Sequence, residues 1–409
     1  TTVARFIALC FMSFTLGKDL GIVMAKGVVI GVIACVTILP SMILVCDKLI
    51  EKTKHKVIMP DLGRIAGWIT KHYVVFAIAF VVILVPALYG YTHTDVYYDL
   101  TNTLPETFNS KVGNDKLTEQ FNMGATHMIL ADSNLSAKDS MNMIDEIKKV
   151  DGVKLAVSLD SITGPSVPQE MIPDEVKDEL KSGKYQLMLV ASEYASATDE
   201  VNAQCDEINK IIKKYDDSAM LIGEAPCTKD LIEITDVDFR NVSIISIGAI
   251  FIIIAFVFKS ISLPIILVSV IEFAIFINMG IPAYTGTVIP FIASIVIGTI
   301  QLGATVDYAI LMTNKYKRNR SRGMEKKEAI TDALEKSIQS ILVSALSFFA
   351  ATFGVGIYSD IDMIGSLCML MARGAIISMI VVAFILPSML MIFDRIICAT
   401  SAGFRIKNK

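Results

Sequence analysis

A carboxyl group lies inside an apolar segment, in the run 301–314 that reads Gln-Leu-Gly-Ala-Thr-Val-Asp-Tyr-Ala-Ile-Leu-Met-Thr-Asn. Asp307 precedes a basic connector by about seven residues, which in a membrane helix places it roughly 10 Å below the membrane surface. A charged aspartate there costs about 2.5–3.5 kcal/mol, whereas burial raises the carboxyl pKa and favours the protonated form. The pattern predicts a proton-binding residue; a structural Asp307, hydrogen-bonded to a neighbouring helix, is the alternative.

Small and polar residues near Asp307 are candidates for a proton path. Tyr308 follows it directly, and the helical period places Thr299, Gly303 and Asp307 on one face. Small residues on that face allow a second helix to approach closely. The candidate supporting residues are Gln301, Gly303, Thr305, Ser344 and Ser347.

Glu272 is a second acid in an apolar run, about 12 Å from the end that Pro264 marks and therefore close to the depth of Asp307. Two interpretations stay open. Glu272 extends the proton path, or it is neutral and hydrogen-bonded to backbone or to a polar group on another helix.

The composition places these acids in a membrane protein. Hydrophobic residues make up 53% of the 409 residues and charged residues 19%, against about 25% charge in soluble domains. The apolar residues form runs of the roughly 20 residues that a membrane helix needs. We therefore expect an α-helical polytopic membrane protein with about eight spans, at 1–16, 27–46, 73–91, 241–258, 263–281, 289–313, 338–358 and 374–393.

Charge is segregated along the chain. Of the 41 acidic residues 27 lie between Asp95 and Asp236, against 13 of the 37 basic residues. Most of the other basic residues gather in the connectors 48–72 and 314–337 and in the tail 397–409, which fall on one side if each span crosses once. Lys and Arg mark the cytoplasmic side, so the hydrophilic segment 92–238 is expected to be extracytoplasmic.

A repeat relates the two ends of the chain. Shifted by 347 residues, Met-Ala-Lys-Gly at 24–27 falls on Met-Ala-Arg-Gly at 371–374, and Ile-Leu-Pro-Ser-Met at 38–42 falls on the same letters at 385–389. This pattern favours an internal duplication; independent likeness of two helix ends is the alternative. The expected organisation is two helices of a first repeat (1–47), a cytoplasmic connector with an interfacial helix (48–72), the first helix of a second repeat (73–91), the extracytoplasmic domain (92–238), five membrane helices (239–396) and a basic tail (397–409).

The last apolar run, 363–393, is too long for one span and is interrupted by Arg373. We expect 363–372 to lie at the outer membrane interface and 374–393 to cross. Arg373 would then extend its side chain to the outer head groups.

The segment 92–238 alternates between strand and helix patterns. Helical stretches are expected at 111–121, 137–149 and 197–214, with a short acidic helix after the loop 164–173. Strands are expected at 126–131, 153–158, 185–191 and 219–223. A β-α-β pattern that occurs twice predicts a ferredoxin-like, porter-type domain.

The Gly-Ala-Thr-Val-Asp-Tyr motif at 303–308, the Met-Ala-Arg/Lys-Gly and Leu-Pro-Ser-Met helix ends, and the order of one helix, a domain and five helices resemble the MMPL-type exporters of the resistance-nodulation-division superfamily. The resemblance implies that Asp307 and Tyr308 form one Asp-Tyr pair of a proton relay. It also implies an equivalent pair on a helix that this sequence lacks, in an N-terminal half of the same protein.

These features predict a bacterial plasma-membrane transporter that uses protons to export a hydrophobic or amphiphilic lipid, drug or peptide. The alternatives are a sterol-sensing or receptor-like protein and a proton-driven helper of protein translocation. No P-loop, metal-ligand spacing or nucleophile–base arrangement is visible, so we expect neither an enzyme nor a cofactor, with protons as the coupling ion. Membrane lipids, the substrate, the N-terminal half and a second copy of the chain are the candidate partners, and nucleic acid is not.

Overall fold

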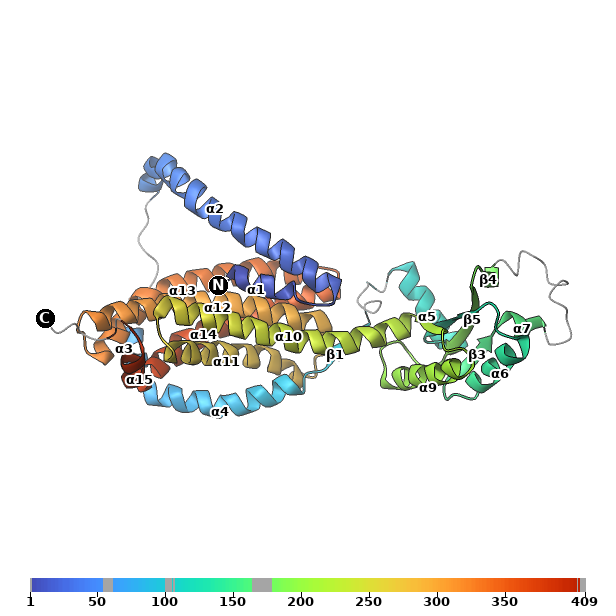
Figure 1. Ribbon diagram of the computed structural model, residues 1–409. Coiled ribbons are helices and arrows are strands. Elements are labelled where there is room, and N and C mark those ends of the chain that lie inside the picture. Colours follow the sequence, from blue (N-terminus) through green and yellow to red (C-terminus); the bar gives the residue numbers. More distant parts are fainter. Residues whose placement is uncertain are drawn as a thin grey trace. The chain divides into compact units, whose positions relative to one another are not determined.

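The computed structural model describes residues 2–53, 62–99, 105, 107–163, 179–402 and 404 (Figure 1). The chain forms two compact units, one of Thr1–Val96 with Asp236–Lys409 and one of Tyr97–Thr235. The domain boundaries predicted from the sequence place the hydrophilic segment at 92–238. The short acidic helix expected after 164–173 and parts of the basic connector 48–72 and of the tail 397–409 lie outside the described residues.

The membrane unit, Thr1–Val96 with Asp236–Lys409, is built of helices. Seven helices among the described residues are long and apolar enough to cross a membrane. A stretch of about 20 apolar residues meets the thickness of a bilayer core, and each of these helices has at least that length. They are α2 (Thr15–Lys52), α4 (Tyr73–Thr92), α10 (Glu224–Phe258), α11 (Ser262–Thr285), α12 (Phe291–Ser321), α13 (Lys326–Tyr358) and α14 (Asp362–Ile392).

About eight spans were predicted, and the first of them, 1–16, is not among the seven membrane-length helices of the described residues. Its described part forms α1 (Thr2–Leu9), whose 8 residues extend only about 12 Å. After Leu9 the chain turns into α2, and contacts with Asp238 hold this turn. The backbone N–H groups of Ser13 and Phe14 donate to Oδ2 of Asp238, at 2.8 and 3.0 Å. A carboxylate at a helix N-terminus satisfies amides that have no partner inside the helix.

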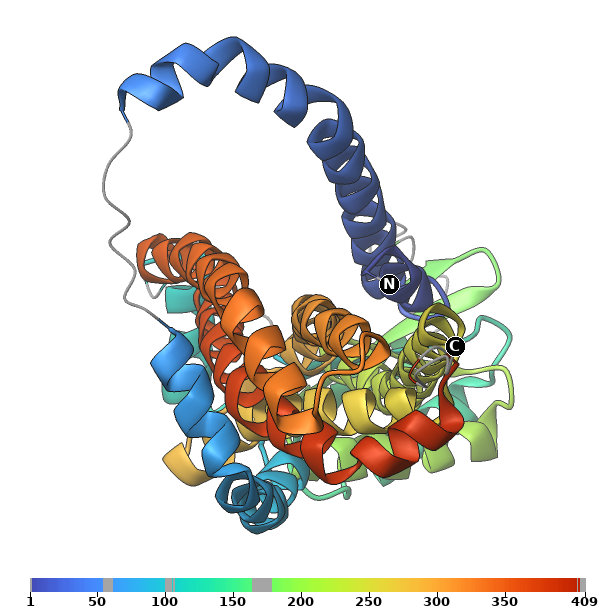
Figure 2. The ribbon, with the colours of Figure 1, turned by 90° about the vertical axis from the view of Figure 1, so that its left-hand side faces the viewer.

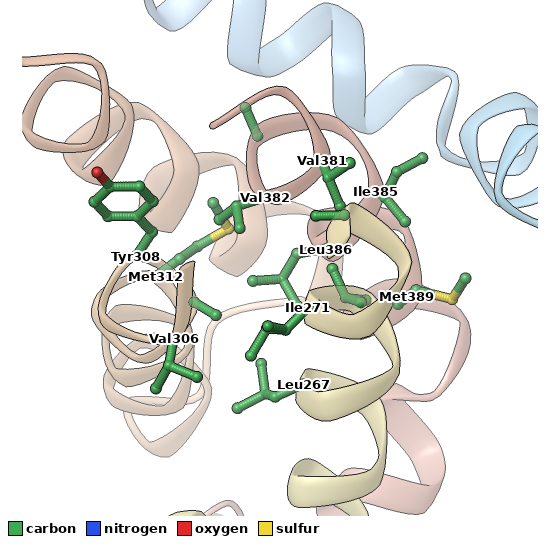
Figure 3. Packing of buried hydrophobic residues seen from close by; sticks show 14 of the residues in the cluster. Leu267, Ile271, Val306, Tyr308, Met312, Val381, Val382, Ile385, Leu386 and Met389 are labelled. Atoms are coloured by element: carbon green, nitrogen blue, oxygen red, sulfur yellow. The ribbon is translucent and has the colours of Figure 1, made fainter. Parts of the chain in front are cut away.

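The core of the membrane unit lies between α11, α12 and α14, whose membrane-spanning windows are 61%, 65% and 67% buried. Figure 3 shows Leu267 and Ile271 facing Leu386 across this core. By contrast, α2 packs on α1 (Figure 2). Most of the apolar side chains of α2 are exposed. Burial therefore identifies α11, α12 and α14 as the helices that hold the bundle together.

Helices α4 and α11 approach each other at glycine. A Cβ added to Gly90 would lie 2.6 Å from the carbonyl oxygen of Gly280, and one added to Gly280 would lie 2.8 Å from the carbonyl oxygen of Ala87. Small residues let two membrane helices bring their backbones together. At this end of the bundle β1 (Val96–Tyr97) pairs with β7 (Ile289–Pro290), and the short helices α3 (Gly63–Lys71) and α15 (Asp394–Thr400) lie at the other end (Figure 1).

The second unit is a sheet with helices. The strands are β2 (Thr126–Asp132), β3 (Val153–Val157), β4 (Lys181–Ser182), β5 (Tyr185–Ser192) and β6 (Met220–Gly223), and the helices are α5 (Asn109–Phe121), α6 (Ala137–Ile147), α7 (Leu159–Thr163) and α9 (Asp199–Tyr215). Four strands run in the order β3-β5-β2-β6, every pair antiparallel, and β4 pairs with β5. Alternate residues of β2, such as Ile129 and Ala131, pack with α6 and α9 in one core. Strands and helices predicted at these places are confirmed to within about two residues; α7 and β4 were not predicted.

Candidate functional site

The predicted site lies on α12. Gln301, Thr305 and Tyr308 point into the bundle, with exposed fractions of 4%, 0% and 6%, and Gly303 is also buried. The side chain of Asp307 is exposed on the flank of the membrane unit. Successive residues of a helix point about 100° apart. The Asp-Tyr pair therefore sends its carboxyl group outward and its ring inward.

The face predicted to join Thr299, Gly303 and Asp307 is divided by its surroundings. Thr299 is buried and its Oγ1 donates to the carbonyl oxygen of Ile295 at 2.7 Å, whereas Asp307 is exposed. Asp307 lies 14 residues before the end of α12 at Ser321, which is roughly 21 Å along the helix axis. The carboxyl group therefore lies well inside a helix of membrane-spanning length, on a surface whose neighbours are lipid or another helix.

Tyr308 connects α12 to α13. Its hydroxyl donates to Oγ of Ser344 at 3.4 Å, a distance at the long end for a bond between hydroxyl groups. Figure 3 shows the Tyr308 ring at the edge of the apolar cluster, with its hydroxyl directed away from Leu386. Ser347, the other predicted supporting serine on α13, is exposed and donates to the carbonyl oxygen of Val343. Of the two serines, the structure brings only Ser344 to the Asp-Tyr pair.

Gln301 is the centre of a buried hydrogen-bond network. Its Oε1 accepts from Nδ2 of Asn278 on α11 at 2.8 Å. Its Nε2 lies 3.1 Å from Oγ of Ser378 on α14 and donates to it. Thr305 Oγ1 donates to the carbonyl oxygen of Gln301 at 2.6 Å and lies 2.7 Å from the same Ser378 Oγ. Two of the predicted supporting residues thus join α12 to both neighbouring core helices.

The guanidinium of Arg373 joins this network through Asn278. The expectation that the Arg373 side chain extends to the outer head groups was therefore wrong. Residues 363–372 and 374–392 belong to one continuous helix, α14. The side chain of Arg373 turns inward, where Nε donates to Oδ1 of Asn278 at 2.8 Å and Nη2 donates to the backbone oxygen of Asn278 at 2.7 Å. These two acceptors offset part of the cost of burying the guanidinium charge within the bundle.

Asn278 and Ser378 were missed as site residues. Each is a single polar residue in an apolar run and each is fully buried, with an exposed fraction of 0%. Buried polar groups in a membrane need internal partners because lipid offers none. In the sequence, the presence of Asn278 and Arg373 within two apolar runs was the feature that could have indicated a contact between them.

Glu272 stays outside the Gln301 network. It is six positions before Asn278 on α11, so the two side chains leave the helix in different directions. Glu272 is half-buried and lines two cavities, of about 140 Å³ and about 820 Å³. The structure therefore gives the second membrane acid an environment of its own.

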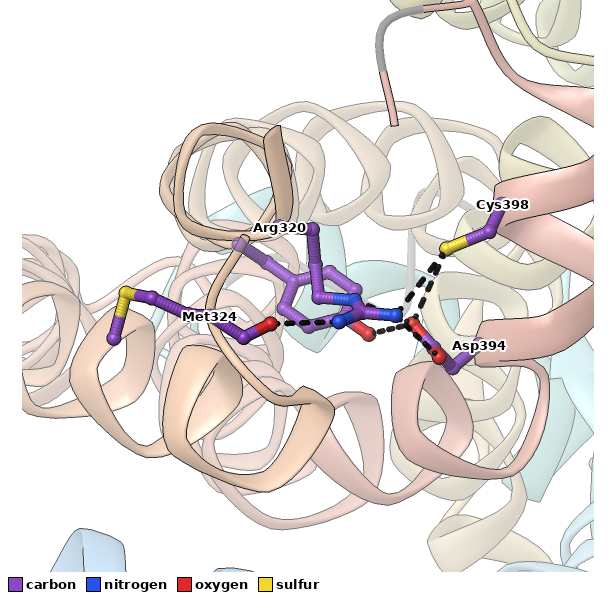
Figure 4. Close-up of polar contacts among 5 residues, drawn as sticks. Arg320, Met324, Asp394 and Cys398 are labelled. Atoms are coloured by element: carbon purple, nitrogen blue, oxygen red, sulfur yellow. Dashed lines mark hydrogen bonds and ion pairs between the residues drawn. The ribbon is translucent and has the colours of Figure 1, made fainter. Parts of the chain in front are cut away.

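A second polar cluster lies at the end of the bundle formed by α3 and α15 (Figure 4). Arg320 holds the carboxylate of Asp394 with two hydrogen bonds, from Nε to Oδ1 at 3.1 Å and from Nη2 to Oδ2 at 3.0 Å. Tyr316 donates to the same carboxylate, and Cys398 Sγ lies 3.5 Å from Oδ1. Bidentate pairs of this kind are among the strongest polar contacts in proteins. The cluster joins the C-terminal part of α12 to α15.

No group of three or more His, Cys, Asp or Glu side chains within the described ranges could hold a metal ion. Two carboxyl groups, those of Asp307 on α12 and Glu272 on α11, lie within the apolar stretches of membrane-length helices.

Comparison with known proteins agrees with this architecture. The family model described as the MMPL family matches residues 109–403. A relative from Bacillus subtilis (strain 168), named "Putative membrane protein YdgH", is 24% identical over 218 residues, which are 52% of this chain and 23% of the relative. The match thus spans less than a quarter of that relative's length. Because the family model covers most of the chain, including all helices from α5 to α15, this membrane protein belongs to the MMPL family.

Proposed function

We propose that this chain is part of a proton-driven secondary transporter that exports hydrophobic or amphiphilic molecules across the plasma membrane of a bacterium. The observation that carries the proposal is the position of Asp307, whose side chain is exposed on the flank of a membrane-length helix. A charged carboxylate facing hydrocarbon costs about 2.5–3.5 kcal/mol, and protonation removes that cost. Whether Asp307 is protonated or ionised then decides which kind of surface can pack against it.

Transport follows if protonated and ionised Asp307 favour different packing of the neighbouring helices. A ligand, here a proton, shifts a conformational equilibrium by as much as its affinity differs between the two states. One charge that crosses 100 mV releases about 2.3 kcal/mol, which is enough to drive such a shift. Tyr308 supplies the second polar group. Its long hydrogen bond to Ser344 is weak enough to be exchanged for one to an opposing acid.

The second unit supplies a domain for substrate handling. Its strand order β3-β5-β2-β6, with α6 and α9 in the connections, supports the predicted ferredoxin-like, porter-type arrangement. The basic connectors support an extracytoplasmic position for it. There it would receive the substrate at the outer membrane–water interface.

The experiment reconstitutes the full-length protein in vesicles that contain a pH-sensitive dye, imposes a proton gradient and follows both proton flux and movement of ethidium, an amphiphilic fluorescent probe. Asp307→Asn should abolish gradient-driven flux and probe movement. Asp360→Asn, which removes an exposed acid from the connector between α13 and α14, is the matched control and should leave both unchanged.

Gradient-driven flux at the normal rate in Asp307→Asn would remove Asp307 from the mechanism. Proton flux that depends on Asp307 while neither ethidium nor a fluorescent phospholipid moves would instead favour a non-exporting use of the proton, such as assistance to protein translocation.

A further inference from the structure

A cavity of about 140 Å³ lies between α4, α10, α11 and α12, in the part of the bundle nearer the β1–β7 end. Its lining includes Tyr91 on α4, Ser246 on α10, Glu272 on α11 and Thr299 on α12. Gly298 forms part of the wall, and a Cβ added there would meet no atom within 4 Å. The space has room for several water molecules, each of which occupies about 30 Å³ in the liquid.

The hydroxyl group of Ser246 is a buried polar group in the wall of this cavity. Ser246 is only 3% exposed, and its Oγ has no hydrogen-bond partner among the residues that the structure describes. A buried hydroxyl without a partner costs roughly 1–3 kcal/mol. Ser243 on α10 and Ser294 on α12 line the same cavity. A water cluster bonded to two to four such groups is the usual way to satisfy them.

Glu272 separates this cavity from a very different one. The larger cavity, of about 820 Å³, lies between α4, α11, the end of α14 and α15, and its lining is apolar apart from Ser262, Ser269 and Glu272. Hydrocarbon on that side penalises the charged carboxylate, whereas hydroxyl groups and water on the other side stabilise it. Whether Glu272 carries its charge therefore depends on the hydration of the smaller cavity.

We propose that the cavity lined by Ser246, Glu272 and Thr299 holds a water cluster and that Glu272 is a second proton-binding site of the membrane unit, reached through this water. The proton passes from hydronium to a carboxylate oxygen of Glu272, which leaves water and a neutral carboxyl group. This proposal deepens the proton coupling proposed above and rests on it for its purpose, but the site is defined by its water and can be tested without transport.

Radiolytic footprinting of the purified full-length protein provides the test, because hydroxyl radicals formed from local water oxidise the side chains beside it. Met279 lines the cavity and Met391 packs in the apolar core, and both are 3% exposed. Bulk solvent reaches them equally little, so water in the cavity should oxidise Met279 about fivefold or more faster than Met391. Gly298→Leu, which places an apolar side chain in the cavity, should reduce the rate at Met279 to that at Met391.

Infrared spectroscopy tests the proton. The carboxyl band that disappears in Glu272→Gln should shift within seconds of transfer to D₂O, and in Gly298→Leu it should shift much more slowly. Equal oxidation of Met279 and Met391, or a Glu272 band that fails to exchange over hours in the wild type, would overturn the proposal. If Gly298→Leu does not fold, these two wild-type measurements still decide the question. Neither result depends on Asp307 or on substrate movement, so failure here is distinct from failure of the transport proposal.

Discussion

The guanidinium of Arg373 binds both the side-chain and the backbone oxygen of Asn278, at 2.8 and 2.7 Å. Asn278 in turn donates to the carbonyl oxygen of Leu370, one turn before Arg373 on α14. The two helices thus exchange hydrogen bonds in both directions at one level of the bundle. A fixed positive charge is held inside the membrane unit by an uncharged partner.

Arg373→Lys should destabilise the protein although it keeps the charge. A single ammonium group lacks the planar fork that reaches both oxygens of Asn278, and one hydrogen bond inside a membrane protein is worth roughly 1–2 kcal/mol. The thermal midpoint in detergent, followed by size-exclusion chromatography after heating, measures the loss. Arg395→Lys, at an exposed position on α15, is the control and should have no effect. Equal midpoints for the two variants would show that the paired contact contributes nothing.

Asp394→Asn should weaken the contact between α12 and α15. Arg320 and Asp394 have side chains that are 21% and 11% exposed, so loss of one charge leaves the other largely buried without compensation, at a cost of about 3 kcal/mol. A double-mutant cycle with Arg320→Gln, read from the emission of the single tryptophan Trp68 on α3, measures the coupling. Additive effects of the two substitutions would contradict a direct interaction.

Gly90→Ala should force α4 away from α11. The added methyl group would lie 2.6 Å from the carbonyl oxygen of Gly280, and overpacking of this kind costs about 1–3 kcal/mol. Gly248→Ala on α10 is the matched control, because a Cβ at Gly248 meets nothing within 4 Å. Alanine at that position should be neutral or stabilising through its helix propensity. Unfolding in a denaturing detergent compares the two variants; a Gly90→Ala protein as stable as the wild type would rule out the close approach.

His127 should make the second unit less stable in acid. It is fully buried in β2, and burial lowers the pKa of its ring below the usual 6.5, an effect that the hydrogen bond to Gln204 only partly offsets. The unfolded chain therefore binds a proton more readily than the folded chain, so this contribution to stability is complete above pH 6.5 and is lost as the pH falls through the lowered pKa.

Labelling of the buried Cys205 in the same unit by a maleimide, resolved by mass spectrometry, measures this opening. Because the thiol itself titrates, His127→Gln is compared with the wild type at each pH. The ratio of wild-type to variant labelling should rise from pH 7 to pH 5. For His93→Gln, at an exposed position, the ratio of wild-type to variant labelling should stay near one at every pH. A ratio for His127→Gln that does not change with pH would contradict the prediction.

The sequence allowed the elements of the second unit to be located closely, because alternation in a strand such as 126–131 and the helical period at 137–149 are local signals. It also located Asp307 and Glu272, since a charge in an apolar run is visible without a structure. The inward turn of Arg373 could not be predicted, because hydropathy gives the depth of a residue and not the direction it faces. That direction is decided by Asn278, 95 positions away in the sequence.

The same limit applies to the first segment. Residues 1–16 have the composition of a membrane span, but the chain turns after Leu9 because Asp238, on a helix more than two hundred residues away, accepts from two amides at the turn. Tertiary contacts of this kind override local preference. Gln301 was identified as polar and close to the acid, whereas its role as the junction of three helices required the structure.

The hydrogen bonds of Gln301 hold α12 in register with α11 and α14. Six residues, about 9 Å along the axis, separate this junction from Asp307. Sliding of α12 past α11 and α14 would break the bonds to Asn278 and Ser378 together. Beyond Gln301, α12 is held again, by Thr305 against Ser378 at 2.7 Å and by Arg320 against Asp394 at 3.0 and 3.1 Å. Asp307 therefore lies on a stretch of α12 that is anchored on both sides, so a change in its charge would act on the surfaces that pack against its outer face.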